Sequence, residues 1–180
     1  VNASALISGI HGDTRLNTVS GDIIGDGLEG DIAVNAVSGD VQIRELVGTL
    51  GANSVSGDIA ATGEIRKTSI DTVSGAMVVD STGPTHTIGL NTVSGNATVR
   101  LDRSLPVNVV ARSVSGRVQV DGVVRSGSGP TNYSGSTGEL SGMFADIRTN
   151  SVSGDLTILR RDGATDAGAA TADSDAEGAW

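Results

Sequence analysis

The sequence predicts an all-β fold, a single-stranded parallel β-solenoid or right-handed β-helix of about eight coils of 18–21 residues. Three observations predict it: a Ser-Gly pair that recurs at nearly constant spacing, apolar residues that alternate around each pair, and a composition poor in aromatic residues. A unit of this length cannot bury a core by itself, so each unit must stack on the next and share one interior. Right-handed winding is the general preference of parallel crossover connections.

The recurring pair sets the number of coils. Its serines are Ser20, Ser38, Ser56, Ser74, Ser94, Ser115, Ser134 and Ser153. Successive serines are separated by 18, 18, 18, 20, 21, 19 and 19 residues. Val precedes seven of them, whereas Tyr133 precedes Ser134, so the seventh copy is blurred. Because this copy divides a gap of 38 residues into two equal steps, we expect a coil there as well.

Each copy is predicted to carry one long strand that runs through the Ser-Gly pair. The residues three and five positions after the Ser are mostly apolar, as Val41 and Ile43 are after Ser38. The Val before the Ser continues the same alternation, with the small Gly between. Apolar residues at every second position are typical of a strand with one buried face, so all of these columns are expected to face the interior.

A second, shorter strand is predicted upstream of each Ser, where Ile32 and Val34 or Ile88 and Leu90 alternate. Between the two strands, three residues before the Ser, stands a polar column of Asn17, Asn35, Asn53, Asp71, Asn91, Arg112, Thr131 and Asn150. Asn tolerates left-handed backbone angles, so we expect this column at a bend, where stacked side chains can bond as a ladder. Two or three faces per coil remain open.

Composition agrees with a solenoid and limits the partners. Aromatic residues make up 2% of the 180 residues, Gly occurs 26 times and Cys is absent. A narrow stack of aliphatic columns needs no large rings, and no 3.6-residue apolar period indicates a helix. The net charge of −9 argues against a nucleic-acid partner. No apolar run is long enough to span a bilayer, so the chain has no predicted membrane-spanning segment.

The predicted organisation is a β-solenoid repeat domain over residues 1–160, with an irregular coil or loop at 126–142. The period fades after residue 160, and Ala, Asp, Gly and Thr replace the strand pattern. Residues 161–180 are therefore predicted to form an acidic disordered tail.

Candidate sites are few. The column Asp22, Asp40 and Asp58 is the one candidate for a cation, but solvated turn carboxylates are the favoured interpretation because calcium needs more oxygen ligands. The stretch 25–30 matches a dinucleotide fingerprint by letters, yet a strand follows it, so a turn is predicted. His11 and His86 lie in separate coils. We therefore expect no catalytic residue, no cofactor and no enzymatic activity.

The phrase Thr-Val-Ser-Gly-Asp-Ile at 18–23, with relatives at 36–41, 54–59 and 151–156, resembles the bacterial adhesin-like family of β-strand-repeat proteins, a domain of unknown function with Val-Ser-Gly-Asp repeats. The resemblance spans residues 5–160, and the copy at Tyr133 departs from it. It implies a parallel β-solenoid and a role as a surface adhesin, and it brings no catalytic motif.

The leading hypothesis is a non-catalytic structural or binding module, an adhesin-like β-solenoid that presents polar ladders to a cell-surface glycan or protein. The cell envelope or the extracellular space is favoured over the cytoplasm. The alternative is a self-assembling bactofilin-like scaffold, built through the exposed edges at the solenoid ends. A polysaccharide-active β-helix enzyme is less favoured, because the chain has one Trp, one Tyr and one Phe, none beside an acidic pair.

Overall fold

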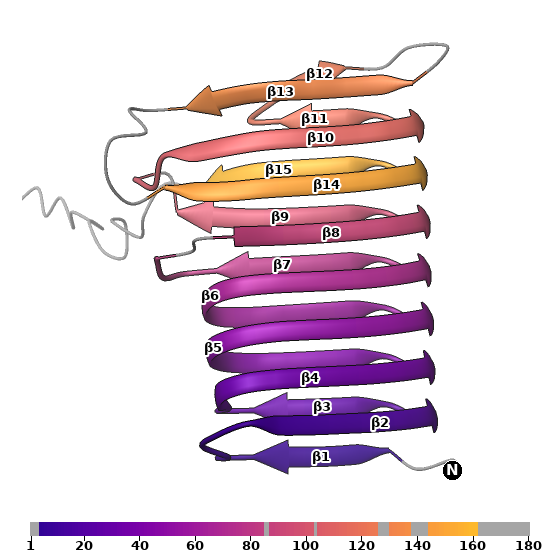
Figure 1. Cartoon of the computed structure of the whole chain (residues 1–180), viewed down its shortest axis with the longest axis vertical. Helices are drawn as coiled ribbons and strands as arrows, with labels where there is room; N and C mark the ends of the chain where they lie inside the picture. The colour runs from indigo at the N-terminus through magenta and orange to yellow at the C-terminus, as the bar shows by residue number, and fades with distance from the viewer. Residues whose placement is uncertain (1–3, 85–86, 103, 126–129, 138–143, 162–180) are drawn as a thin grey trace, which may run out of the picture.

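The computed structural model describes residues 4–84, 87–102, 104–125, 130–137 and 144–161. These residues form strands and no helix, which confirms the all-β prediction for this part of the chain (Figure 1). The strands are β1 (Ala5–Ser8), β2 (Thr14–Ser20), β3 (Ile23–Asp26), β4 (Glu29–Ser38), β5 (Val41–Ser56), β6 (Ile59–Ser74), β7 (Met77–Ser81), β8 (Thr87–Ser94), β9 (Ala97–Asp102), β10 (Val107–Ser115), β11 (Val118–Val120), β12 (Val123–Arg125), β13 (Thr131–Thr137), β14 (Ala145–Ser153) and β15 (Leu156–Arg161). These described residues contain no helix that is long and apolar enough to cross a membrane.

Each coil has two faces, which answers the question that the sequence left open. The front sheet runs in the order β2-β4-β5-β6-β8-β14-β10-β13, and the back sheet in the order β1-β3-β5-β6-β7-β9-β15-β11-β12. β5 and β6 belong to both sheets, because each bends from the back face to the front face within one continuous strand. Equivalent residues of neighbouring coils pair in parallel register, so the architecture is β-solenoid-like.

The tight turn of each coil lies at the Ser-Gly pair. β4 ends at Ser38, and β5 starts three residues later at Val41 on the other face. Gly39 between them has a φ of 118°, and a methyl group there would overlap the backbone carbonyl of Gly21 in the neighbouring coil. Only Gly therefore lets the corners of successive coils stack at the strand spacing.

The predicted positions of the long strand and of the bend in each coil are therefore wrong. The long strand expected through the Ser-Gly pair is interrupted there by the turn. The Asn column, expected at a bend, lies inside the front strands, with Asn35 in the middle of β4 and its side chain exposed. The physical reason is that Gly at the corner removes a steric barrier that Asn would keep, so the sharper turn forms at Gly.

The interior is a stack of aliphatic columns. Positions three and five after the Ser are buried, as predicted, from Ile23 in the first of these coils to Ile158 in the last. The upstream positions, such as Ile32 and Val34, are buried too. No aromatic side chain belongs to this buried core among the described residues, and Tyr133 packs only partly against it. The composition argument for a narrow core is therefore confirmed.

The coils do not all stack in sequence order. β14 lies between β8 and β10 in the front sheet, and β15 lies between β9 and β11 in the back sheet. In Figure 1 these two strands, near the C-terminal end of the colour scale, sit between strands coloured for residues 87–120. The prediction that each unit stacks on the next in sequence is wrong here. We refer to β14–β15 as the inserted coil.

The seventh copy of the repeat is not a coil. β13, which contains the Tyr133-Ser134-Gly135 copy, pairs antiparallel with β10, and β12 pairs antiparallel with β11. The two strands close this end of the stack, and we call them the antiparallel cap (Figure 1). The expected coil at this position is therefore wrong, as is a purely parallel solenoid. The predicted loop at 126–142 falls partly on β13 and partly outside the described residues, where His86 and residues 162–180 of the predicted tail also lie. Arg161, predicted to begin the tail, instead ends β15.

Candidate functional site

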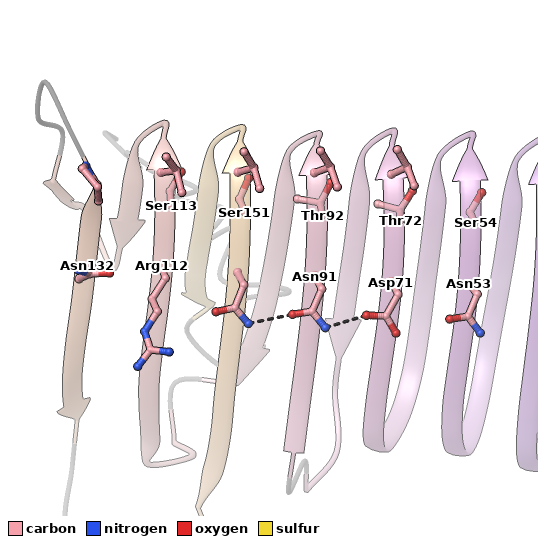
Figure 2. A pocket seen from close by; sticks show the side chains of 16 residues that line it. Asn53, Ser54, Asp71, Thr72, Asn91, Thr92, Arg112, Ser113, Asn132 and Ser151 are labelled. Carbon is pink, nitrogen blue, oxygen red and sulfur yellow. Dashed lines mark hydrogen bonds between the residues drawn. The ribbon is translucent and has the colours of Figure 1, made fainter.

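A groove crosses the front sheet at right angles to its strands. Its two hollows, with volumes of about 660 and 350 Å³, meet at Asn53 and Ser54 and together extend over β2, β4, β5, β6, β8, β14 and β10. Side chains two residues apart on each strand form its two sides, and the inward-pointing residue between them forms its floor. Figure 2 shows the larger hollow, which also reaches Pro130 and Asn132 at the end of the stack. We call it the front groove.

One side of the front groove is the Asn column, in which amide groups bond from coil to coil. Asn35 Nδ2 donates to Asn17 Oδ1 at 2.9 Å, and Asn53 Nδ2 donates to Asn35 Oδ1 at 3.1 Å. The ladder predicted from the sequence is thus present, although on a flat strand and not at a bend.

The ladder also passes through the inserted coil. Asn150 Nδ2 donates to Asn91 Oδ1 at 2.8 Å, and Asn91 Nδ2 donates to Asp71 Oδ1 at 2.7 Å (Figure 2). Arg112 of β10 follows Asn150 in register, and Asn132 of the antiparallel cap lies opposite Arg112. The column therefore ends, at the cap, with a cation beside an amide.

The other side of the groove is a row of valines, one from each front strand. It consists, in stacking order, of Val19, Val37, Val55, Val73, Val93, Val152 and Val114. Their exposed fractions lie between 47% and 57%, so the prediction that this column is buried is wrong. The reason is the alternation of side chains along a strand: Ala36 and its equivalents point inward, so the Val that follows points outward. The turn then interrupts the alternation, and Val41 points inward again. We call this set the Val row.

The floor between the two sides carries buried hydroxyl groups. Thr72 Oγ1 and Ser54 Oγ donate to the carbonyl oxygens of Ser74 and Ser56 on their own strands. Thr92 Oγ1 and Ser151 Oγ, which lie on neighbouring strands, have no hydrogen-bond partner among the described residues. Most buried polar groups in proteins have a hydrogen-bond partner, so these two hydroxyls give the section of the groove at the inserted coil unsatisfied hydrogen-bonding capacity.

The Asp column lies at the turn and not in the groove. Asp22 Oδ1 accepts the backbone N–H of Asp40 at 3.0 Å, and Asp40 Oδ1 accepts the N–H of Asp58 at 2.9 Å. Asp58 Oδ1 in turn accepts the N–H of Ala76 at 2.7 Å. Each carboxylate thus bonds the amide of the same position one coil further on. No group of three or more His, Cys, Asp or Glu residues that could hold a metal ion occurs in the described ranges.

The other candidates from the sequence do not meet in one place. The stretch 25–30 spans the end of β3, a turn and the start of β4, as predicted, and no helix begins there. His11 lies on the surface with Nε2 at 3.5 Å from Glu29 Oε2. The repeated serines at the corner donate across coils, as Ser38 Oγ does to the carbonyl of Val19 at 3.2 Å. These contacts are structural, and they leave the front groove as the candidate site.

Sequence reasoning missed the front groove because it assigned the Val row to the core. A signal was present in the alternation itself. Thr18, Ala36 and their equivalents, one residue before each Val, continue the inward parity of Ile32 and Val34. Had the Ser-Gly pair been taken as the turn, the same parity would have placed the valines outside.

Fold and groove together define a β-solenoid-like module with a long, repetitive surface site. The family model Toastrack DUF4097 matches residues 13–159, and the chain belongs to this family, a domain of unknown function. No curated protein and no solved structure matches the chain. The family membership agrees with the β-strand-repeat part of the resemblance, and the adhesin role stays a prediction.

Proposed function

We propose that this chain is a non-catalytic binding module that holds an extended, linear glycan along the front groove. The observation that carries the proposal is the continuity of the groove: a polar side, made mostly of Asn, and a methyl side repeat in register over the front strands from β2 to β10. A surface role, as the family resemblance implied, is part of this proposal.

The two sides match the two kinds of surface on a sugar ring. Asn35 and Asn91 each use one N–H and one lone pair of the amide within the column, which leaves one donor and one acceptor on each to face outward. Outward-facing amides suit sugar hydroxyls. The exposed methyl groups of the Val row supply an apolar surface for the C–H faces of the ring.

The spacing of the groove favours a glycan over a polypeptide. Neighbouring coils lie about 4.8 Å apart, the usual spacing of hydrogen-bonded strands. An extended polypeptide repeats its side-chain direction only every two residues, or about 6.6 Å, and loses register with the coils. One pyranose unit of an extended β-1,4-linked chain advances by a distance close to the coil spacing, and successive units face opposite ways. The chain therefore repeats over two units, close to two coil spacings, so equivalent contacts can recur at every second coil.

Repetition would supply the affinity. The groove is built on strands that backbone pairing holds in place, so little conformational entropy is lost when a ligand binds. Weak contacts along a rigid face add as long as the ligand can engage them together. We therefore expect the affinity to rise with the length of the glycan until it spans the groove.

The groove lacks the groups that glycan cleavage requires. Glycosidases use a pair of carboxylates on either side of the scissile bond. Among the described residues that line the groove, Asp71 is the one carboxylate, and its Oδ1 accepts a hydrogen bond from Asn91. A binding role without catalysis is therefore the more economical proposal.

The test is affinity electrophoresis of the whole chain in gels that contain linear β-linked or branched polysaccharides. Substitution Val73→Asp together with Val93→Asp places charges in the methyl side, and we expect the retardation by a linear glycan to fall at least tenfold. Val124→Asp is the matched control, because Val124 is 53% exposed on β12 and does not line the groove. No retardation of the wild-type chain by any polysaccharide, or equal retardation of all variants, would contradict the proposal.

The alternative of end-to-end assembly has less support. The antiparallel cap covers the last front and back strands, β10 and β11, so this end does not offer a parallel edge to another copy. Head-to-tail growth through both ends would need that edge.

A further inference from the structure

The inserted coil occupies a slot between two coils that are closer together in sequence than either is to it. One side of the slot is formed by β8 and β9, and the other by β10 and β11. The chain leaves β9 at Asp102, forms β10 to β13, and then returns to fill the position that it had left open. All four strands that line the slot therefore precede residues 145–161 in the chain.

The two sides of the slot are also complementary to each other. Asn150 of the inserted coil pairs with Asn91 on one side and with Arg112 on the other, at the same repeat position. The corner repeats this: the Asp155 N–H donates to Asn96 Oδ1 at 3.0 Å, and the Arg117 N–H donates to Asp155 Oδ1 at 2.9 Å. β10 could thus pair directly with β8 in the same register. Backbone pairing alone does not select which coil fills the slot.

Two adjacent arginines give the inserted coil contacts that are specific to the slot. Arg161 Nη2 lies 2.7 Å from Asp80 Oδ1, and Nη1 donates to Asp80 Oδ2 at 3.2 Å, across β9 to β7. The backbone N–H of Arg160 donates to Asp121 Oδ1 at 3.1 Å on the opposite side, and its guanidinium pairs with the same carboxylate. Charge-assisted pairs of this geometry favour residues 145–161 in the slot over any other coil.

We propose that the slot is a strand-exchange site between two copies of this chain, in which each copy receives the inserted coil of the other. Such an exchange keeps the strand pairings of the inserted coil and both arginine contacts. Exchange of an identical element is a low-cost route to a dimer. During synthesis and folding, β10 and β11 precede the inserted coil, so an open slot is available to a neighbouring copy as well as to its own.

Whether a slot receives its own inserted coil or that of a second copy depends on the protein concentration. The chain's own inserted coil competes through its effective concentration, which a short connection makes high. A second copy competes only when the protein is folded at high concentration or when synthesis brings copies together. We therefore expect monomers from dilute refolding and exchanged dimers from concentrated refolding.

A pair of single-cysteine copies tests the proposal, because the natural chain has no Cys. Val93 of β8 lies opposite Val152 of β14, between the paired positions Thr92–Ser151 and Ser94–Ser153, and both valines are about half exposed. Copies with Val93→Cys and copies with Val152→Cys, each with its own affinity tag, are unfolded, mixed, refolded at high concentration and oxidised. In an exchanged dimer these two cysteines lie on neighbouring strands, so an exchanged coil favours a disulfide between the two kinds of copy.

We expect the mixed disulfide dimer to be several-fold more abundant than in the control, in which Val37→Cys replaces Val152→Cys on the same exposed row. Equal amounts in both mixtures would overturn the proposal. The pair Thr98→Cys and Thr157→Cys reports the back side of the slot in the same way, since these residues pair between β9 and β15. Sedimentation that finds only monomers of the unmodified chain after concentrated refolding would overturn the proposal as well.

Discussion

The coils of residues 5–102 and those of residues 107–161 use the same repeat but stack differently. In the first region the coils pair in sequence order up to β8 and β9, whereas in the second the last coil lies between two earlier ones, one of which is the coil of β8 and β9. The corner contacts are nevertheless alike. The Asp58 N–H donates to Asp40 Oδ1 at 2.9 Å, and the Asp155 N–H donates to Asn96 Oδ1 at 3.0 Å. The repeat thus encodes the shape and the edges of a coil, but not the identity of its neighbour.

Residues outside the repeat distinguish the second region. Arg160 and Arg161 follow the last repeat phrase and bond carboxylates on opposite sides of the inserted coil. The antiparallel cap closes the stack beyond β10 and β11. Order in the second region therefore depends on a few side chains and one hairpin-like closure, and each can be removed without a change to the repeat.

The largest expected effect comes from the corner that both regions share. Gly57→Ala places a methyl group against the backbone carbonyl of Gly39 at a φ of 118°, and we expect the free energy of unfolding to fall by roughly 3 kcal/mol or more. Gly51→Ala is the control, because a Cβ there meets nothing closer than the Ile32 carbonyl at 4.0 Å. Urea denaturation measures both variants. Similar stabilities for the two would show that the corner does not limit the stacking.

A smaller effect should separate the two regions. Arg161→Ala removes the ion pair with Asp80, and we expect about 1 kcal/mol of destabilisation, with faster amide exchange in β14 and β15 than in β4 and β5. Arg148→Ala is the control on the same inserted coil, since among the described residues Arg148 pairs with Asp146 of its own strand, and its side chain is 68% exposed. Equal exchange rates in both regions of the Arg161 variant would contradict the special role of this arginine.

The Asn column is expected to contribute less per residue. Asn35→Ala removes one bond to Asn17 and one to Asn53, and we expect a loss of about 0.5–1 kcal/mol for these exposed contacts. Thermal unfolding against the wild-type chain measures it. Because the column serves ligand binding in our proposal, the loss in the free energy of glycan binding should exceed this modest loss in the free energy of unfolding. The reverse order of effects would assign the ladder to structure alone.

The smallest expected effect is a dependence of stability on pH through Asp102, the last residue of β9. Hydrogen bonds from the backbone N–H and the hydroxyl of Ser104 lower the pKa of Asp102, with a further contribution from the Arg161 charge. A pKa that is lower in the folded state stabilises the fold above the unfolded value of about 3.9. This contribution is lost as the pH falls through the folded value.

Ser104→Ala removes the hydroxyl contact, so the pKa of Asp102 should move up toward its usual value. NMR titration of the Asp102 carboxyl carbon measures the change. An unchanged titration midpoint in the variant would mean that this hydroxyl does not act on the carboxylate.

The repeat made the coil predictable from the sequence, and most of the core with it. Ile32, Val34, Val41 and Ile43 were assigned to the interior from alternation and spacing alone, because each coil contributes the same inward positions. The Asn ladder followed from stacking in register. Right-handed winding stays a prediction that rests on the general preference of crossover connections.

The features that could not be predicted are those for which the repeat sequence is compatible with more than one structure. Both Ser-Gly and Asn are plausible bends, and the choice between them decided whether the Val row was buried or exposed. The blurred copy at Tyr133 has the spacing of a coil but lies antiparallel, since its pairing is set by β10 and not by its own phrase. The insertion depends on ion pairs such as Arg161–Asp80, which join residues 81 positions apart.

Two double-cysteine variants of a single chain test the central claim, the order of the coils, most directly. Val93 lies opposite Val152 in neighbouring strands, whereas Val114 lies one strand further, at about twice the strand spacing of ~4.8 Å. In dilute protein, Val93→Cys with Val152→Cys should form an intramolecular disulfide on mild oxidation, and Val93→Cys with Val114→Cys should not. A disulfide in the second variant and none in the first would show that the coils stack in sequence order and would contradict the account.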